Sequence, residues 1–173
     1  PNILIHDLNA IIRYWVAVKG VKMVWLDYLR YIDLPDTPKF HYMAPEKQKD
    51  YIMQQLLKCS KDCGIPIILL HQLNREAGKR TDKTPQLGDL RDSGAIEEIA
   101  SFVFFVHRPE QYNIMEDEQG RSTKNITEII LAKNSDGISN VKFRMLNDSE
   151  FFSMKEEYYE PILKTEIADS LPF

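Results

Sequence analysis

Two polar residues stand at the ends of apolar runs, the places where a parallel sheet usually binds its ligands. The run VKMVWL ends at Asp27, and Gln72 stands two residues beyond the run IPIILL. A carboxylate at a strand end can hold Mg²⁺ beside nucleotide phosphates, and a neighbouring amide can orient a water or contact a terminal phosphate. Asp27 and Gln72 are therefore candidates for a nucleotide site. The plainer alternatives are a solvated Asp27 and a Gln72 that bonds to loop backbone.

A loop that carries basic residues follows Gln72 and leads into a short helix. Its cations modestly outnumber its acids, and they are Arg75, Lys79, Arg80 and Lys83. Such a loop can follow the phosphate backbone of single-stranded nucleic acid, whereas a solvated loop is the simpler alternative. The helix is expected to open at Asp92 or Ser93, residue types that cap helix starts, ahead of the apolar Ile96.

The first elements that must position these residues alternate between strand and helix. Residues 3–5 begin a strand, and apolar residues at helical spacing then predict an amphipathic helix that ends at Gly20. Residues 21–26 form the strand that leads to Asp27. The chain enters its first strand at once, which we interpret as the start of a larger domain having been removed.

The next elements lead to Gln72. Residues 30–44 contain two prolines and are predicted to form a loop. A helix follows from Pro45 to Gly64, with a proline in its first turn and a glycine as its C-terminal cap. Residues 65–70 are continuously apolar, which is typical of a strand buried on both faces.

Three further strands are expected after the short helix. They cover residues 102–106, 126–132 and 139–145, with a polar insertion over residues 108–125. The last two strands flank turn residues at 135–137, and apolar residues alternate with polar ones in the last strand. This alternation predicts an antiparallel hairpin with one solvated face.

The order of elements predicts an α/β fold, with a mostly parallel sheet, helices on both faces and the antiparallel hairpin at its C-terminal end. Residues 148–173 are acidic and contain Pro161 and Pro172, so we expect them to form a flexible tail. The predicted organisation is therefore one domain over residues 1–147, followed by an acidic C-terminal tail.

The composition is that of a single soluble domain. The 173 residues are 43% hydrophobic and 28% charged, and no apolar run approaches the roughly 20 residues that cross a bilayer. Because a signal-peptide pattern is also lacking, we expect a cytoplasmic protein. The net charge of -4 argues against a globally basic nucleic-acid binder. Cys59 and Cys63 lack the partners of a zinc site and are expected to be reduced core residues.

Four stretches also carry a family resemblance. They are LDYLRYI, HQLNREAGKRTDKTPQLGDLRDSGAIEEIA, FVFFVHRPE and LAKNSDG. In this order and at these separations they resemble the second half of the RecA-like motor domain of DnaB-type replicative helicases. The resemblance covers about residues 1–147 and implies a RecA-like P-loop NTPase fold.

The resemblance implies a role for each candidate residue. Asp27 corresponds to the Walker B aspartate, which serves Mg²⁺ through water, and Gln72 corresponds to the glutamine that senses the γ-phosphate of ATP. Lys133 corresponds to a lysine that reaches into the neighbouring subunit's site. The residues implied to contact DNA in the ring's central channel are Arg91, Asp92 and Gly94, to which the basic loop adds Lys79, Arg80 and Lys83.

Partners are implied in the same way. They are ATP and Mg²⁺ as cofactors, single-stranded DNA, other copies of the chain in a hexameric ring, and primase or other replication proteins. The last residues, IADSLPF, are similar to the acidic tip with which bacterial single-stranded-DNA-binding proteins recruit replication proteins. An aromatic ring and a terminal carboxylate at Phe173 would suit a pocket with a basic residue.

Two departures from the family pattern matter. The phosphate-cradling motif G-x-x-x-x-G-K-[ST] is absent, because no glycine stands five residues before Gly78-Lys79. We therefore expect the isolated chain to bind ATP weakly and to lack useful turnover. Ser135 stands where the family has an arginine, which leaves the transition-state charge to Lys133 or to an arginine elsewhere, such as Arg108.

The sequence thus predicts a fragment of an ATP-dependent DNA helicase that lacks the N-terminal P-loop strand. In RecA-like sheets that strand lies between the sensor-glutamine strand and the strand after the channel helix. Residues 67–70 and 102–106 should therefore flank an unfilled position with adhesive backbone edges. The alternative is a catalytically dead RecA-like paralogue that acts as a binding or assembly module. A RecA-like recombinase or kinase fits the strands but not the stretch that contains LRDSG.

Overall fold

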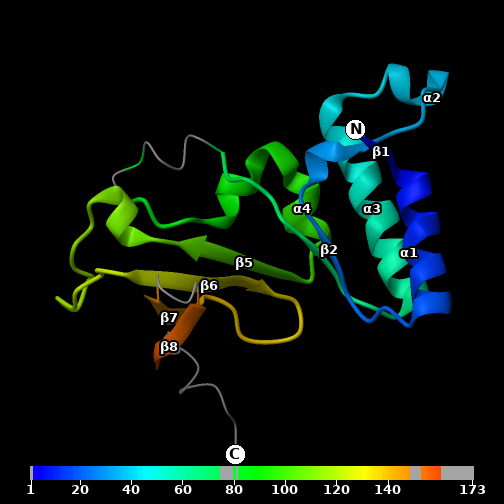
Figure 1. Ribbon diagram of the computed structural model, residues 1–173. Coiled ribbons are helices and arrows are strands. Elements are labelled where there is room, and N and C mark those ends of the chain that lie inside the picture. Colours follow the sequence, from blue (N-terminus) through cyan, green and yellow to red (C-terminus); the bar gives the residue numbers. More distant parts are fainter. Residues whose placement is uncertain (1, 75–79, 81, 149–152, 161–173) are drawn as a thin grey trace, which may run out of the picture. The chain divides into compact units, whose positions relative to one another are not determined.

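The computed structural model describes residues 2–74, 80, 82–148 and 153–160 (Figure 1), with the side chains of residues 91–95, 148 and 157–160 outside the description. The chain divides into two compact units. The first comprises Pro1–Asn74 and Gly88–Ala100, and the second comprises Arg75–Leu87 and Ser101–Phe173.

Two long helices pack together in the first unit. They are α1 (Ile5–Lys19) and α3 (Pro45–Cys63), which lie side by side (Figure 1). Both end where the sequence predicts, because Gly20 and Gly64 adopt left-handed backbone with φ of 66° and 63°, a conformation that costs glycine nothing. Within the apolar stripe of α1, Ile11 and Trp15 are exposed, and the buried apolar residues are Ile5, Leu8 and Ile12.

The strands of the first unit form two parallel pairs. β1 (Ile3–Leu4) pairs with β3 (Ile32–Asp33), and β2 (Val24–Leu26) pairs with β4 (Ile67–Leu69). The predicted strands are therefore present, although each is shorter than its apolar run. β4 is half-buried within this structure, whereas the sequence predicted burial on both faces.

The predicted loop over residues 30–44 is partly wrong. The segment holds the end of a 3₁₀ turn η1 (Leu29–Tyr31), the strand β3 and a one-turn helix α2 (Pro38–His41). Ile32 and Phe40 are buried and anchor these elements. Elements of two to four residues are too short to produce a periodic pattern, which is why the sequence did not show them.

A 3₁₀ helix and a short α-helix complete the first unit. η3 (Leu87–Ser93) leads directly into α4 (Gly94–Ile99), so the helix predicted near Asp92 or Ser93 is present. α4 packs on α3, and Leu90 and Ile96 are buried.

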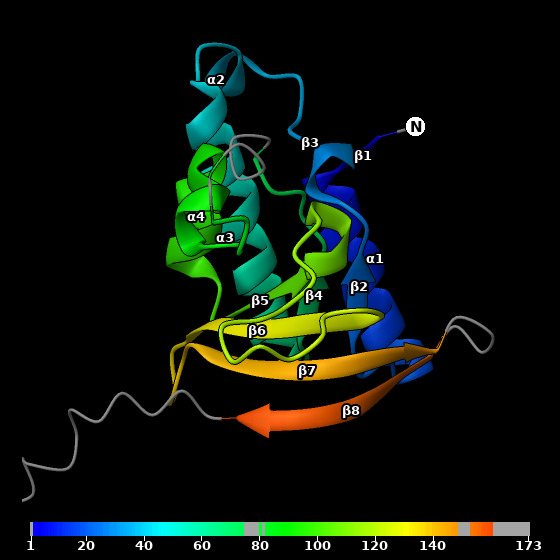
Figure 2. The same cartoon turned by 90° about the vertical axis from the view of Figure 1, so that its left-hand side faces the viewer.

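The second unit is built on a four-stranded antiparallel sheet. Its strands follow in the order β5 (Phe102–His107), β6 (Ile126–Asn134), β7 (Val141–Asp148) and β8 (Ser153–Glu160) (Figure 2). The predicted hairpin is the β6–β7 pair. β8 corrects the prediction of a flexible tail, because Ser153–Glu160 pairs with the otherwise open edge of β7. Residues 161–173, including the IADSLPF ending, lie outside the described residues.

The polar face of the hairpin is covered, which corrects the prediction that it is solvated. His107, Glu128 and Arg144 are 3%, 4% and 4% exposed, and the register places them opposite one another on neighbouring strands. The segment between β5 and β6, which contains η4 (Pro109–Tyr112), supplies the cover. The ring of Tyr112 stacks on His107 with centroids 5.4 Å apart.

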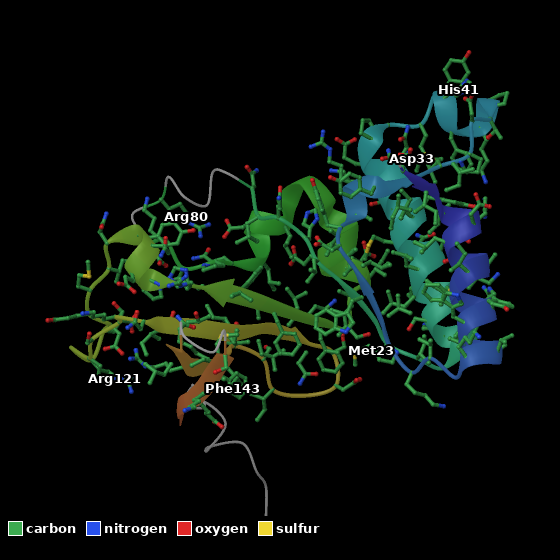
Figure 3. All side chains as sticks on the ribbon, viewed as in Figure 1. Met23, Asp33, His41, Arg80, Arg121 and Phe143 are labelled. Atoms are coloured by element: carbon green, nitrogen blue, oxygen red, sulfur yellow. The ribbon has the colours of Figure 1, made fainter. Side chains whose placement is uncertain are left out.

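Ion pairs hold this covering segment to the sheet. Arg144 donates through Nη1 to Asp117 Oδ2 at 2.8 Å and through Nη2 to the carbonyl oxygen of Ser122 at 2.9 Å. Arg121, labelled in Figure 3, donates through Nε to the same Asp117 oxygen at 2.8 Å. Burial opposes ionisation of Asp117, but hydrogen bonds from Arg121 and from the N–H of Gln119 outweigh it and lower the pKa of the carboxyl.

The strands β4 and β5 each have one hydrogen-bonded neighbour among the described residues. β4 pairs with β2, β5 pairs with β6, and the two strands do not pair with each other. The sequence predicted that these strands flank the place of a further strand. That a further strand belongs at the second edge of each of these strands stays a prediction.

The remaining sequence expectations concern the cysteines and membranes. Cys59 and Cys63 are free, and Cys59 is buried, as predicted. Burial, reinforced by Cys63 with its Sγ 4.0 Å away, raises the pKa of the Cys59 thiol to about 11. In the part of the chain that the structure describes, no helix combines the length and apolar character needed to cross a membrane.

Stability of the second unit should depend on pH through His107. Burial lowers the pKa of His107; Glu128 and Asp82 oppose this shift, and Lys142 reinforces it. The stability contribution of neutral His107 is complete above its ordinary pKa of about 6.5. It is lost as pH falls below that value, because the unfolded chain then binds a proton that the folded chain resists.

This dependence can be measured by hydrogen exchange of β5 and β6 amides between about pH 7.5 and 5.5, the range in which histidine titrates. His107→Phe keeps an aromatic ring against Tyr112 and removes the titrating group, so it should flatten the pH dependence. An equal loss of protection on acidification in the wild type and the variant would contradict the assignment to His107.

Candidate nucleotide site

Asp27 and Gln72 emerge at the same edge of the β2–β4 pair. The register pairs Leu26 with Leu69, and the N–H of Leu70 donates to the carbonyl oxygen of Leu26 at 2.9 Å. Because paired strands lie about 4.8 Å apart, Asp27 follows β2 beside Leu70, two residues before Gln72. Both candidate residues are exposed. Both residues therefore follow the carboxyl ends of two paired parallel strands, the edge at which ligands of open sheets bind.

The one candidate carboxylate at this edge, Asp27, suits Mg²⁺ only when a nucleotide is bound beside it. Among the described residues, no three or more His, Cys, Asp and Glu side chains are grouped to hold a metal ion. A single carboxylate is nevertheless sufficient for Mg²⁺, which keeps several waters and binds through one or two carboxylates plus substrate phosphates. Asp27 fits that role, through water, when phosphates supply the remaining ligands.

The chain after Gln72 is tied to the stretch that the sequence assigns to DNA. The N–H of Asn74 donates to the carbonyl oxygen of Asp89 at 3.1 Å, and Asp89 is buried in η3. This hydrogen bond links the segment after β4 to the residue just before the LRDSG stretch, both within the first unit. The backbone of that stretch holds Arg91 and Asp92 in η3 and Gly94 at the first position of α4, with their side chains outside the description.

Arg80, by contrast, braces its own loop in the second unit (Figure 3). Its Nε donates to the carbonyl oxygen of Asp82 at 3.3 Å, and its Nη2 donates to that of Thr84 at 2.8 Å. The N–H of Thr84 donates to Asp82 Oδ1 at 2.8 Å and lowers the pKa of that carboxyl. Part of the Arg80 guanidinium therefore fixes the loop. Lys83 is half-buried, and Lys79 lies outside the described residues.

Lys133 lies in the second unit, near the end of β6. It is half-buried and pairs with Val103 of β5. The turn that follows is anchored, because the N–H of Ser135 donates to the carbonyl oxygen of Ser101 at 2.9 Å. Asn134 closes the same turn with its side-chain amide. Sequence reasoning missed Asn134, although asparagine ahead of Ser-Asp-Gly is a recognisable turn signal.

Arg108 lies at the other end of β5 from Lys133. The register pairs Val103 with Lys133 and His107 with Glu128, and Arg108 follows His107. Arg108 therefore lies five positions along the chain from Val103, which amounts to roughly 17 Å at about 3.4 Å per residue. Arg108 therefore leaves β5 at the strand end opposite to the one that pairs with Lys133.

Comparisons with known proteins identify relatives of this chain. The family model for the DnaB-like helicase C terminal domain matches residues 1–154. The replicative DNA helicase DnaB of Geobacillus stearothermophilus is 30% identical over 162 residues, covering 92% of this chain and 34% of that protein. A probable plasmid replicative DNA helicase of Chlamydia psittaci is 35% identical over 136 residues, covering 76% of this chain and 27% of that protein.

Solved structures share the fold. One of them, an ATPase domain, matches with a TM-score of 0.73 and 25% identity, over 88% of this chain and 51% of that one. A second match is the structure of a DnaB-like replicative helicase, which was described together with that helicase's interactions with primase. It has a TM-score of 0.72 and 25% identity, over 88% of this chain and 35% of that one. The RecA-like fold is thus confirmed.

The chain spans between 21% and 34% of the length of curated relatives such as these. The family match nevertheless extends beyond the residues that carry the resemblance and includes both the β2–β4 edge and the turn after Lys133. The chain therefore belongs to the family of DnaB-like helicase C-terminal domains.

Proposed function

We propose that this chain is part of the motor domain of an ATP-dependent replicative DNA helicase. The proposal is supported by the register of the β2–β4 pair, in which Asp27 follows β2 beside Leu70, two residues before Gln72 on the chain that leaves β4. A carboxylate for Mg²⁺ beside an amide for the terminal phosphate is the pairing that phosphoryl transfer uses at such an edge. The replicative helicases among the relatives support the same activity.

Each residue then has one task. Asp27 orients the water ligands of Mg²⁺, which when bound neutralises charge on the phosphates of ATP. Gln72 donates a hydrogen bond through its side-chain NH₂ to an oxygen of the terminal phosphate and so reports whether that phosphate is present. Lys133 supplies positive charge to the nucleotide site of a neighbouring copy. The phosphates have no cradle in residues 1–173, because the G-x-x-x-x-G-K-[ST] motif is absent from this sequence.

The reading frame upstream of Pro1 tests the proposal against its alternative. An in-frame phosphate loop with the sequence Gly-Lys-Ser or Gly-Lys-Thr supports a helicase motor. A frame that begins at or shortly before this chain and lacks such a loop supports a catalytically dead paralogue that binds or assembles. ATP turnover by the purified product of the complete frame decides between them directly.

Single-stranded DNA is the proposed track, and the contacts are proposed to be with its phosphates. Arg91, Asp92 and Gly94 lie where η3 gives way to α4, and backbone amides at a helix start can donate to phosphate oxygens. Lys79, Arg80 and Lys83 add the cations of the adjoining loop. We propose further that the complete protein assembles as a hexameric ring in the cytoplasm and contacts primase or other replication proteins.

Replacing Lys79, Arg80, Lys83 and Arg91 with alanine should weaken single-stranded DNA binding by the complete protein, irrespective of base sequence. The slope of log affinity against log salt should also become shallower, by about 0.7 for each phosphate that the variant no longer neutralises. Fluorescence anisotropy with two oligonucleotides of different sequence, across a salt series, measures both effects.

A matched control removes the same charge elsewhere. Four exposed lysines serve this purpose, namely Lys19, Lys22, Lys58 and Lys61. Their joint replacement should change affinity much less. Equal affinity of the wild type and the first quadruple variant would remove the channel assignment, and equal losses in both variants would reduce it to an effect of net charge.

A further inference from the structure

The turn between β6 and β7 is closed by one side chain. Asn134 Oδ1 accepts a hydrogen bond from the N–H of Asp136 at 3.0 Å, and Asn134 Nδ2 donates to the carbonyl oxygen of Ile138 at 3.1 Å. The amide thus satisfies one donor and one acceptor of the turn backbone. A single residue adjoining Lys133 therefore fixes the course of the chain from 134 to 138.

Neighbouring groups keep the Asn134 amide in place. A Cβ atom on Gly137 would stand 3.2 Å from Asn134 Nδ2, so only glycine leaves the amide its full space. Two backbone hydrogen bonds anchor the ends of the turn: Ser135 N–H to the Ser101 carbonyl at 2.9 Å, and Asn140 N–H to the Leu131 carbonyl at 2.7 Å. The turn is preorganised by contacts that lie entirely within the second unit.

The fixed backbone of this turn matters most for Lys133, because Lys133 is the only cation between residues 131 and 141. The position at which the family carries a second cation is Ser135, and Arg108 lies at the far end of β5. A lysine is a point charge on a flexible stem, so its effect depends on where the backbone holds it. Misplacement by about 1 Å can cost roughly 100-fold in rate.

We propose that Asn134 is a positioning residue that holds Lys133 for its action on the nucleotide site of a neighbouring copy. The inference rests on the proposed function of Lys133. It identifies the Asn134 amide as the group that positions the one cation of this segment. Asn134 touches no reacting atom. Its amide fixes the strand end from which the Lys133 side chain departs.

A double-mutant cycle on ATP turnover by the complete protein tests this. Lys133→Ala should lower kcat about 100-fold, as loss of one charge-stabilising donor does. Asn134→Ala should lower kcat about 10-fold, with the KM for ATP unchanged, because binding groups are untouched. In the Lys133→Ala background, Asn134→Ala should cause no further loss, since its effect passes through the lysine.

Two variants complete the set. Asn134→Asp keeps the acceptor for the Asp136 N–H and loses the donor to Ile138, so its kcat should lie between those of the wild type and Asn134→Ala. It replaces Asn134→Ala in the cycle if that variant folds poorly. Ile138→Ala trims a side chain that is 62% exposed in the same turn and leaves its carbonyl in place. The kcat and KM of Ile138→Ala should match those of the wild type.

A second readout needs only residues 1–173. After reductive methylation with a ¹³C-labelled reagent, the dimethyl-lysine signal of Lys133 should be distinct in the wild type. In Asn134→Ala it should move towards that of exposed Lys124. An unchanged Lys133 signal overturns the proposal.

The outcomes separate the two levels of inference. A silent Asn134→Ala beside an impaired Lys133→Ala overturns the positioning role and leaves the proposed function standing. A silent Lys133→Ala overturns the proposed role of the lysine, and the positioning role with it. Equal further losses from Asn134→Ala with and without the lysine would show a purely structural turn and overturn the inference.

Discussion

Asp27→Ala in the complete protein is expected to lower magnesium-dependent ATP turnover by at least about 100-fold, because the phosphates lose the ion that neutralises their charge in the transition state. Gln72→Ala is expected to lower turnover by a similar factor, since the terminal phosphate loses its sensing amide. Single-stranded DNA binding without nucleotide should survive in both variants. Steady-state turnover and anisotropy on the same preparations measure the two effects.

Matched controls exist on the same unit. Asp33 also stands at the end of a strand of a parallel pair, but it is the last residue of β3 and accepts a hydrogen bond from Asn2 Nδ2 at 2.8 Å. Figure 3 labels it. Asp33→Ala and the exposed Gln54→Ala should leave turnover nearly unchanged. Unchanged turnover in Gln72→Ala would show that the amide has no part in hydrolysis, whatever Asp27 does.

Arg144→Ala is expected to destabilise the second unit by about 3 kcal/mol. Arg144 is buried and joins the covering segment to the sheet through Asp117 and the Ser122 carbonyl. Removing one partner of a buried ion pair leaves the other charge uncompensated, which costs about 3 to 5 kcal/mol. We take the lower value because Asp117 keeps its hydrogen bond from Arg121.

The division of the chain provides an internal reference for this measurement. Both tryptophans, Trp15 and Trp25, belong to the first unit, so their fluorescence reports on that unit. Hydrogen exchange of β6 and β7 amides reports on the second. Arg144→Ala should lower protection in β6 and β7 and leave the tryptophan transition in place.

Arg121→Ala is the graded control for the same network. Its side chain is 38% exposed, and exposed ion pairs contribute about 1 kcal/mol or less. The loss of protection should therefore be much smaller than for Arg144→Ala. Equal losses in the two variants would show that the contacts of Arg144 beyond Asp117 contribute little.

Local chemistry explains which parts of the fold were predictable from sequence. Gly20 and Gly64 end α1 and α3 because glycine alone enters left-handed backbone freely, and that preference is visible in one residue. Strands β2 and β4 are continuous apolar runs, so their existence could also be predicted. Their parallel pairing follows from the helix between them, which places the ends that carry Asp27 and Gln72 at one edge.

Charge patterns gave wrong predictions of exposure where the segment that pairs with or covers a charged residue lies far away in sequence. β8 is rich in charged residues and resembles a tail, yet it completes the edge of β7. Arg144 alternates with apolar residues along β7 and resembles part of a solvated face, and Glu128 lies opposite it on β6. They are buried because residues 109–125 fold over them, and no pattern within β6 or β7 records that cover.

The sequence by itself determined the α/β order, both long helices, the family, and the two strand-end residues, since each depends on local pattern or on a long motif. Only the tertiary structure decided which surfaces are covered and which polar groups are paired. Arg80 braces its own loop, Arg108 is held away from Lys133, and Asn134 closes a turn. Such pairings depend on backbone groups brought together by folding, whose positions no side-chain pattern encodes.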